Sequence, residues 1–187
     1  MKKTSLSVLL LVALSSQAMA ASTNLDVTFT ATLREITCDM AIEGGTGNGQ
    51  SNTIPIGTAG KTSLGDIING NDAASTTFKL KMTDCPSSLQ AIKTTINGTQ
   101  SPDMTTAIKN AATDTAASNL GVTIARATAP TAPFTIGSVE DSKRLVWTSG
   151  EMNSKEVQLI ARLVETKTGQ STTGNVSAVA TFNFEYQ

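Results

Sequence analysis

A strict alternation of apolar and polar residues at the end of the chain constrains the fold more than any other feature of the sequence. The last residues read GNVSAVATFNFEYQ, and every second residue from Val176 to Tyr186 is apolar, with Val179 as the one apolar residue between them. Because successive side chains of a β-strand point to opposite faces, this pattern predicts a half-buried strand. Chain ends usually fray, so a strand this aromatic must be held by something, either in this chain or in another.

The rest of the chain reads as further short strands separated by Gly, Asn, Thr and Pro. Alternation or apolar runs predict strands over residues 25–33, 53–56, 77–82, 91–96, 120–125 and 155–164. Helical signals are few: residues 63–68 are one possible turn of helix, and residues 104–112 fit either a short helix or a loop crossing. Many short strands with turn signals between them predict an antiparallel β-sandwich, and we find no internal repeat or domain boundary.

The N-terminus has the three parts of a secretory signal peptide. Lys2 and Lys3 precede an apolar run over residues 6–14, and Ala18-Met19-Ala20 follows as a small-residue cleavage site. The apolar run is too short for a membrane-spanning helix. We therefore predict that residues 1–20 are a signal peptide and that the mature chain is one exported domain.

Charge argues against nucleic acid as a partner. The chain has 14 Lys and Arg against 15 Asp and Glu, and loss of Lys2 and Lys3 makes the expected mature chain more acidic. No basic run occurs. No other apolar stretch is long enough for a membrane span, so we expect a mature protein that is soluble or assembled outside the membrane.

The chain has two cysteines, Cys38 and Cys85. In an exported protein an isolated pair most simply forms one disulfide. A metal site is the poorer alternative, because two cysteines without histidine offer too few ligands. A redox pair usually has the closer Cys-x-x-Cys spacing.

Several classes of enzyme are excluded by absent residues. The chain has no histidine, which removes Ser-His-Asp and Cys-His catalysis and histidine-bound zinc. The acidic residues Glu140, Asp141, Glu151 and Glu156 stand among Ser, Lys and Asn, which is typical of solvated loops. The glycine cluster at residues 44–49 lacks the lysine and following helix of a phosphate-binding loop, so we interpret it as a turn. A secreted hydrolase is therefore the less favoured hypothesis for the function, and we expect no cofactor.

Three stretches give the chain a resemblance to a known family. VTFTATL at residues 27–33 leads into Cys38, and FKLKMTDC at residues 78–85 carries the second cysteine. At the C-terminus, a glycine stands fourteenth from the end, Gly174, and alternating apolar residues lead to a penultimate tyrosine, Tyr186. Together these stretches resemble pilin subunits of the chaperone–usher pathway, close to the type 1 fimbrial group.

The resemblance implies an incomplete immunoglobulin-like antiparallel β-sandwich that lacks its last strand. A donor strand from a periplasmic chaperone, and later from a neighbouring pilin subunit delivered through an outer-membrane usher, would complete it. It implies a donor extension at residues 21–33 and a pilin domain at residues 34–187. The implied donor side chains are Leu25, Val27, Phe29 and Ala31, the last of which stands where the family often has glycine. The implied groove edge comprises Gly174, Val176, Ala178, Ala180, Phe182, Phe184 and Tyr186.

We therefore expect a structural subunit of a surface fibre used for adhesion, with no enzymatic activity. The alternatives are a minor adaptor subunit and a receptor-binding subunit. The mature chain has room for one domain only, and one Trp and one Tyr are few aromatics for a sugar site. We interpret Trp147 as half-buried packing rather than as a sugar platform.

Overall fold

The computed structural model describes residues 37–187, and the structural statements that follow concern that range. The predicted signal peptide and the predicted donor residues Leu25, Val27, Phe29 and Ala31 lie outside the described residues.

The larger sheet is built around three long strands. They are β4 (Ser75–Thr83), β9 (Glu156–Glu165) and β7 (Leu120–Arg126), which confirm three of the predicted strands. β1 (Asp39–Glu43) flanks β4, and β6 (Ala107–Lys109) flanks β7, giving the order β1-β4-β9-β7-β6 with every pair antiparallel. β1 is therefore one edge of this sheet.

The smaller sheet has the last strand of the chain at its edge. β10 (Thr181–Tyr186) pairs with β5 (Ile92–Asn97), and β5 pairs with β8 (Leu145–Val146), again antiparallel. A separate two-stranded ladder joins β2 (Thr46–Gly47) to β3 (Asn52–Thr53).

The two sheets share one hydrophobic core, so the domain is a β-sandwich. Phe78 of β4 and Phe182 of β10 lie with ring centroids 5.9 Å apart and link the sheets directly. Trp147 is buried, and its indole N–H donates to Thr94 Oγ1 at 3.0 Å, so its one polar group is satisfied in the core. Trp147 is thus packing, as interpreted, although more deeply buried than expected.

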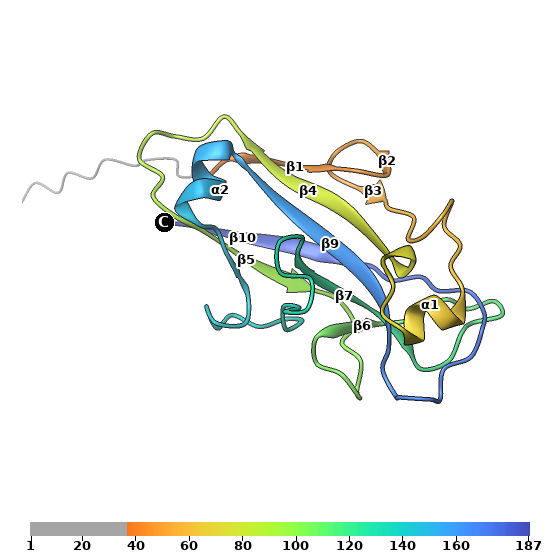
Figure 1. Ribbon diagram of the computed structural model, residues 1–187. Helices are drawn as coiled ribbons and strands as arrows, with labels where there is room; N and C mark the ends of the chain where they lie inside the picture. The colour runs from red at the N-terminus through yellow and green to blue at the C-terminus, as the bar shows by residue number, and fades with distance from the viewer. Residues whose placement is uncertain (1–36) are drawn as a thin grey trace, which may run out of the picture. The chain divides into compact units, whose positions relative to one another are not determined.

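Two short helices and a 3₁₀ turn complete the domain. They are α1 (Leu64–Ile68), η1 (Asp72–Ala74) and α2 (Ser149–Ser154). The Ser63 side chain caps α1, which confirms the predicted helical turn. Figure 1 shows α2 and α1 near opposite ends of β9, so neither helix covers its whole length.

Two secondary-structure predictions were wrong in part. Residues 104–112 contain the strand β6 rather than a helix, because Ala107 and Ile108 are buried against β7 and pair with it in register. The strand predicted over residues 53–56 shrinks to Thr53 in β3, while Ile54 and Ile56 pack against the core without a ladder partner.

The prediction that the acidic residues lie in solvated loops was also wrong for two of them. Glu151 completes a capping box with Thr148 at the start of α2 and forms an ion pair with Arg126 at 2.7 Å. Glu156 begins β9 and binds Lys79 at 2.9 Å. Both carboxylates therefore connect elements of the fold.

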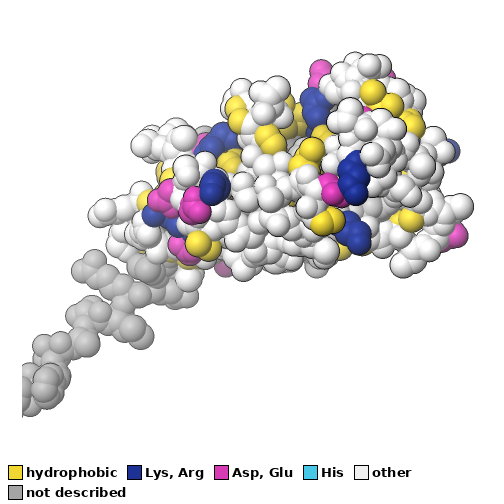
Figure 2. Space-filling model, turned by 90° about the horizontal axis from the view of Figure 1, so that it is seen from below, with side chains coloured by type: hydrophobic (Ala, Val, Ile, Leu, Met, Phe, Trp, Pro, Cys, Tyr) yellow, Lys and Arg dark blue, Asp and Glu magenta, His cyan; other side chains and the backbone are white. Residues whose placement is uncertain are grey.

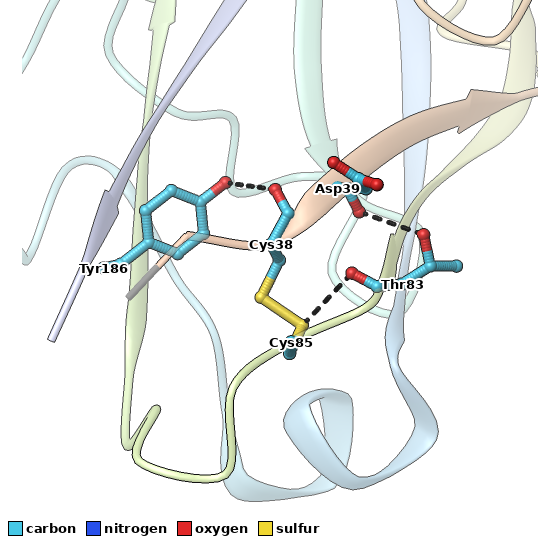
Figure 3. The surroundings of a disulfide bond; sticks show 5 residues. All are labelled: Cys38, Asp39, Thr83, Cys85 and Tyr186. Atoms are coloured by element: carbon cyan, nitrogen blue, oxygen red, sulfur yellow. Dashed lines mark hydrogen bonds between the residues drawn. A yellow bond between two sulfur atoms is a disulfide. The ribbon is translucent and has the colours of Figure 1, made fainter. Parts of the chain in front are cut away.

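Cys38 and Cys85 form a disulfide, as predicted. Cys38 directly precedes β1, and Cys85 follows shortly after the end of β4, so the bond closes the end of the β1–β4 ladder (Figure 3). It thereby holds the edge strand β1 against β4.

Charge on the described surface is mixed. On the face shown in Figure 2, Lys and Arg side chains lie beside Asp and Glu side chains rather than in a patch of one sign. Within residues 37–187, no helix has the length and apolar character needed to cross a membrane. The same range contains no group of three or more His, Cys, Asp or Glu suited to a metal ion.

Candidate strand-docking groove

The C-terminal segment turns its alternate side chains in two directions, as the sequence predicts. Every even-numbered residue from Val176 to Tyr186 is half-buried, and every odd-numbered residue is exposed. Val179, the one apolar residue out of phase, is 72% exposed. Period two therefore places one row of apolar side chains toward the core along the whole segment.

The regular strand is shorter than predicted, because its partner ends first. Thr181 pairs with Asn97, the last residue of β5, so residues 176–180 run on without a neighbour in the ladder. Asn110 and its neighbour hold this extension instead: Ser177 N donates to Asn110 Oδ1 at 3.0 Å, and Ala111 N donates to the Ser177 carbonyl at 2.8 Å.

Gly174 begins this segment at a position that only glycine suits. Its φ of +151° is rare for other residues, and an added Cβ would lie 2.4 Å from the Thr115 carbonyl oxygen. The close approach allows Asn175 N to donate to that same carbonyl at 2.8 Å. Gly174 therefore fixes where the segment enters the domain.

Among residues 37–187, no strand pairs with the outer edge of β10. Gln187 and Ala91 exchange both backbone hydrogen bonds, at 2.9 and 3.0 Å. Hydrogen-bonded pairs alternate along an antiparallel ladder, so Glu185 and Asn183 also bond toward β5. Phe182 and Phe184 consequently turn their backbone N–H and C=O groups away from β5, and no hydrogen bond from another described segment reaches them.

The edge strand β1 lies on the other side of the same opening. Met40 and Ile42 are half-buried and pack against the core. Ile42 N points away from β4 and donates to the Gly49 carbonyl at 2.6 Å. The two sheets thus leave two edges, β10 and β1, facing one groove.

The groove between these edges has a volume of about 1190 Å³. Its floor is made by buried residues of the larger sheet, so a segment that fills the groove would lie directly against the core. The floor residues are Phe78, Leu80, Ile108, Leu120, Val122, Ile124, Ala161 and Leu163. An apolar floor between two strand edges matches an extended segment that supplies both side chains and backbone groups.

The far end of β10 is anchored by this chain itself. Tyr186 Oη donates to the Cys38 carbonyl at 3.2 Å (Figure 3), and burial raises the pKa of the Tyr186 phenol above its ordinary value. Glu185 binds the largely buried Arg144 at 2.8 Å, and its hydrogen bond, with that of Asp141, raises the pKa of Arg144 further. These contacts show part of what holds the C-terminal strand: Arg144 binds its outward face, and the Cys38 carbonyl binds its last residue, Tyr186. No described strand pairs with the groove edge of β10.

The structure gathers most of the predicted edge residues at the groove. Those that line it are Gly174, Val176, Ala178, Ala180, Phe182 and Phe184. Tyr186 does not line it and lies instead beside the disulfide. Sequence reasoning missed the opposite wall at Met40 and Ile42. The short apolar run Met40-Ala41-Ile42 directly after Cys38 was the available signal.

Comparison with known proteins identifies relatives over nearly the whole chain. A family model described as "Fimbrial protein" matches residues 27–187. The uncharacterized fimbrial-like protein YadM of Escherichia coli (strain K12) is 28% identical over 170 residues, which cover 89% of this chain and 88% of YadM.

Two solved structures share the fold. The P pilus rod subunit PapA matches with a TM-score of 0.51 and 18% identity, over 87% of this chain and 100% of that one. A chain from a structure of a chaperone–usher pilus matches with a TM-score of 0.52 and 15% identity, over 91% of this chain and 100% of that one. The predicted all-β, immunoglobulin-like antiparallel architecture is thereby confirmed.

Proposed function

This chain belongs to the fimbrial protein family, and on that premise we propose that it is a structural subunit of a chaperone–usher fimbria that polymerises by donor-strand exchange. The open groove between β1 and β10 carries the proposal. An unpaired strand edge beside an apolar groove is an aggregation hazard in a free domain. A subunit with such a groove needs a partner strand, supplied first by a periplasmic chaperone and then by another subunit at the outer-membrane usher.

We assign the groove in the fibre to residues 25–31 of a second copy of this chain. Leu25, Val27, Phe29 and Ala31 alternate with polar residues, which is the pattern that an apolar floor and two strand edges select. Full burial of the three larger side chains would contribute about 5–9 kcal/mol. Backbone pairing with β10 adds to this, and ordering the extension subtracts from it.

In this proposal residues 1–20 direct export to the periplasm, residues 21–33 are the donor extension and residues 34–187 are the pilin domain. The edge row from Val176 to Phe184 receives the donor, and the assembled fibre stands on the cell surface and serves adhesion without enzymatic chemistry. A minor adaptor or receptor-binding subunit would use the same groove. Immunogold labelling distinguishes the two cases: label along the whole fibre indicates a shaft subunit, and label at a single terminal spot indicates an adaptor.

The test is deletion of residues 21–28 from the chain expressed with its assembly system. We expect a soluble chaperone complex and no fibres by electron microscopy. A matched variant that replaces only the polar Asp26 with Asn keeps the apolar face and should form normal fibres. Normal fibres from the deletion would overturn the proposal. The full-length chain could also stay monomeric and resist denaturant more than the deletion variant does. That result would show that residues 21–28 fill the groove of their own chain.

A further inference from the structure

The two edges of the groove differ within the described part of the chain: no strand pairs with the outer edge of β10, whereas β1 is covered. The outward groups of β1 are occupied by residues 48–52, which we call the edge cover. Ile42 N donates to the Gly49 carbonyl at 2.6 Å, and the Gln50 side-chain amide donates to the Met40 carbonyl at 2.6 Å. The Asn52 amide donates to the Ile42 carbonyl at 3.2 Å.

The edge cover is a preformed unit. Asn48 Oδ1 accepts hydrogen bonds from Gln50 N and Ser51 N at 2.9 and 2.8 Å, and Asn52 Oδ1 accepts one from Gly49 N at 2.8 Å. These short-range bonds do not involve β1. The turn can therefore keep its own shape when it separates from the strand.

Little apolar burial fastens the edge cover to β1. Asn48, Gln50 and Ser51 are exposed, and none of residues 48–52 has an apolar side chain. A docked strand could replace these three hydrogen bonds with its own backbone hydrogen bonds to Met40 and Ile42. Exchange of the turn for a strand is therefore close to balanced in hydrogen bonds, and it gains the apolar contacts of the strand.

We propose that residues 48–52 are a displaceable cover, which protects the β1 edge in the free subunit and leaves it when a donor strand pairs with β1. Covering an edge with a loop is a general protection against edge-to-edge pairing. The incoming strand then pairs first with the bare edge of β10, and displacement of the cover completes its docking. This inference rests on the proposed function and adds a step to it.

The geometry allows the edge cover to be locked in place. A Cβ added at Gly49 would lie 3.7 Å from the Cβ of Ala41, within the range that a disulfide bridges. The φ of Gly49 is +84°, so a cysteine there strains the backbone, and the Gly49→Cys single variant carries the same strain. The double variant Ala41→Cys with Gly49→Cys should therefore form a staple between the cover and β1. Each single variant carries the same substitution without the staple and is its control.

The experiment follows assembly of the full-length mature chain by light scattering and electron microscopy. We expect the oxidised double variant to assemble at least about tenfold more slowly than either single variant, because the staple keeps the cover on Ile42. Reduction of the staple should restore assembly. Assembly of the stapled chain at the rate of the single variants would overturn the inference.

A second arm loosens the cover instead. Gln50→Ala removes one of the three bonds to β1, and we expect assembly about fivefold faster, the change that one neutral hydrogen bond gives. Gln100→Ala is the control, since its amide also donates to two backbone carbonyls, of Thr105 and Ile136, but outside the groove. An unchanged rate for Gln50→Ala would contradict the inference, and this arm decides if the stapled chain does not fold.

Failure of the proposed function gives a different result. If deletion of residues 21–28 leaves assembly unchanged, the proposed function fails and this inference falls with it. If the deletion blocks assembly and neither the staple nor Gln50→Ala changes its rate, only the edge cover is overturned.

Discussion

Phe184 and Asn183 are neighbours on β10 whose side chains have opposite surroundings. Phe184 lines the groove and lies with its ring centroid 6.4 Å from that of Tyr186, whereas Asn183 is exposed on the other face. The alternation of side-chain direction along a β-strand is sufficient to create this contrast. It makes the pair a matched test of which face the partner recognises.

We expect Phe184→Asp to abolish recovery of the subunit with its chaperone, because docking would bury an unpaired charge and lose an apolar contact. The cost is about 2 kcal/mol or more of docking free energy. Asn183→Asp introduces the same charge on the exposed face and should change little. The measurement is co-purification of each variant with the chaperone from periplasm, with the pellet checked for misfolded subunit. Equal recovery of the two variants would show that β10 is not the recognised edge.

At the scale of elements, the helix α2 is connected to the larger sheet by one carboxylate. Arg126 Nε and Nη2 donate to the two carboxylate oxygens of Glu151 at 2.7 and 2.9 Å, and Thr148 N donates to the same side chain at 2.7 Å. Burial opposes ionisation of Glu151, but these hydrogen bonds outweigh it and hold its pKa below the ordinary value of 4.5. The charged carboxylate is therefore the form that the fold stabilises.

Stability from Glu151 should be lost in acid. A carboxyl whose pKa is lowered by folding stabilises the protein above its unfolded pKa and loses that contribution as the pH falls through the folded pKa. We expect Glu151→Gln to lower the free energy of unfolding by about 1–3 kcal/mol at neutral pH. As the pH falls below about 4.5, the Tm of the variant should decrease less than the Tm of the natural chain. Thermal unfolding from pH 7 to pH 3 measures this.

The control for this series is Glu140→Gln. Glu140 pairs with Lys143 at the surface, with both side chains at least half exposed, and such pairs contribute little. Its Tm should follow that of the natural chain at every pH. If Glu151→Gln also follows the natural chain, the ion pair does not stabilise the fold.

At the scale of the whole molecule, the disulfide connects two positions 47 residues apart and closes the ladder that forms one groove wall. We expect replacement of both cysteines by serine to lower the free energy of unfolding by about 2–5 kcal/mol. Urea unfolding measures the loss. Non-reducing mass spectrometry of the natural chain, isolated from the cells that produce it, should show a mass lower by two hydrogens than the chain with two free thiols. Two free thiols would contradict the structure.

The sequence by itself determined the features that depend on near neighbours. Alternation predicted β4, β9 and the C-terminal segment as strands, and it predicted the buried face of the C-terminal segment, because side-chain direction in a strand follows from position alone. Predicted export and an isolated cysteine pair were sufficient to predict the disulfide. Three stretches, at residues 27–33, 78–85 and 174–186, were sufficient to indicate the family.

Tertiary structure decided what depends on partners that are distant in the sequence. Residues 104–112 contain a strand because Ala107 meets Thr123, and β10 begins at Thr181 because β5 ends at Asn97. The cover on β1 likewise depends on a turn folding back to reach Met40. Periodicity records which way a side chain points, but a ladder or a hydrogen bond also needs a second segment, and only the folded chain brings that segment into place.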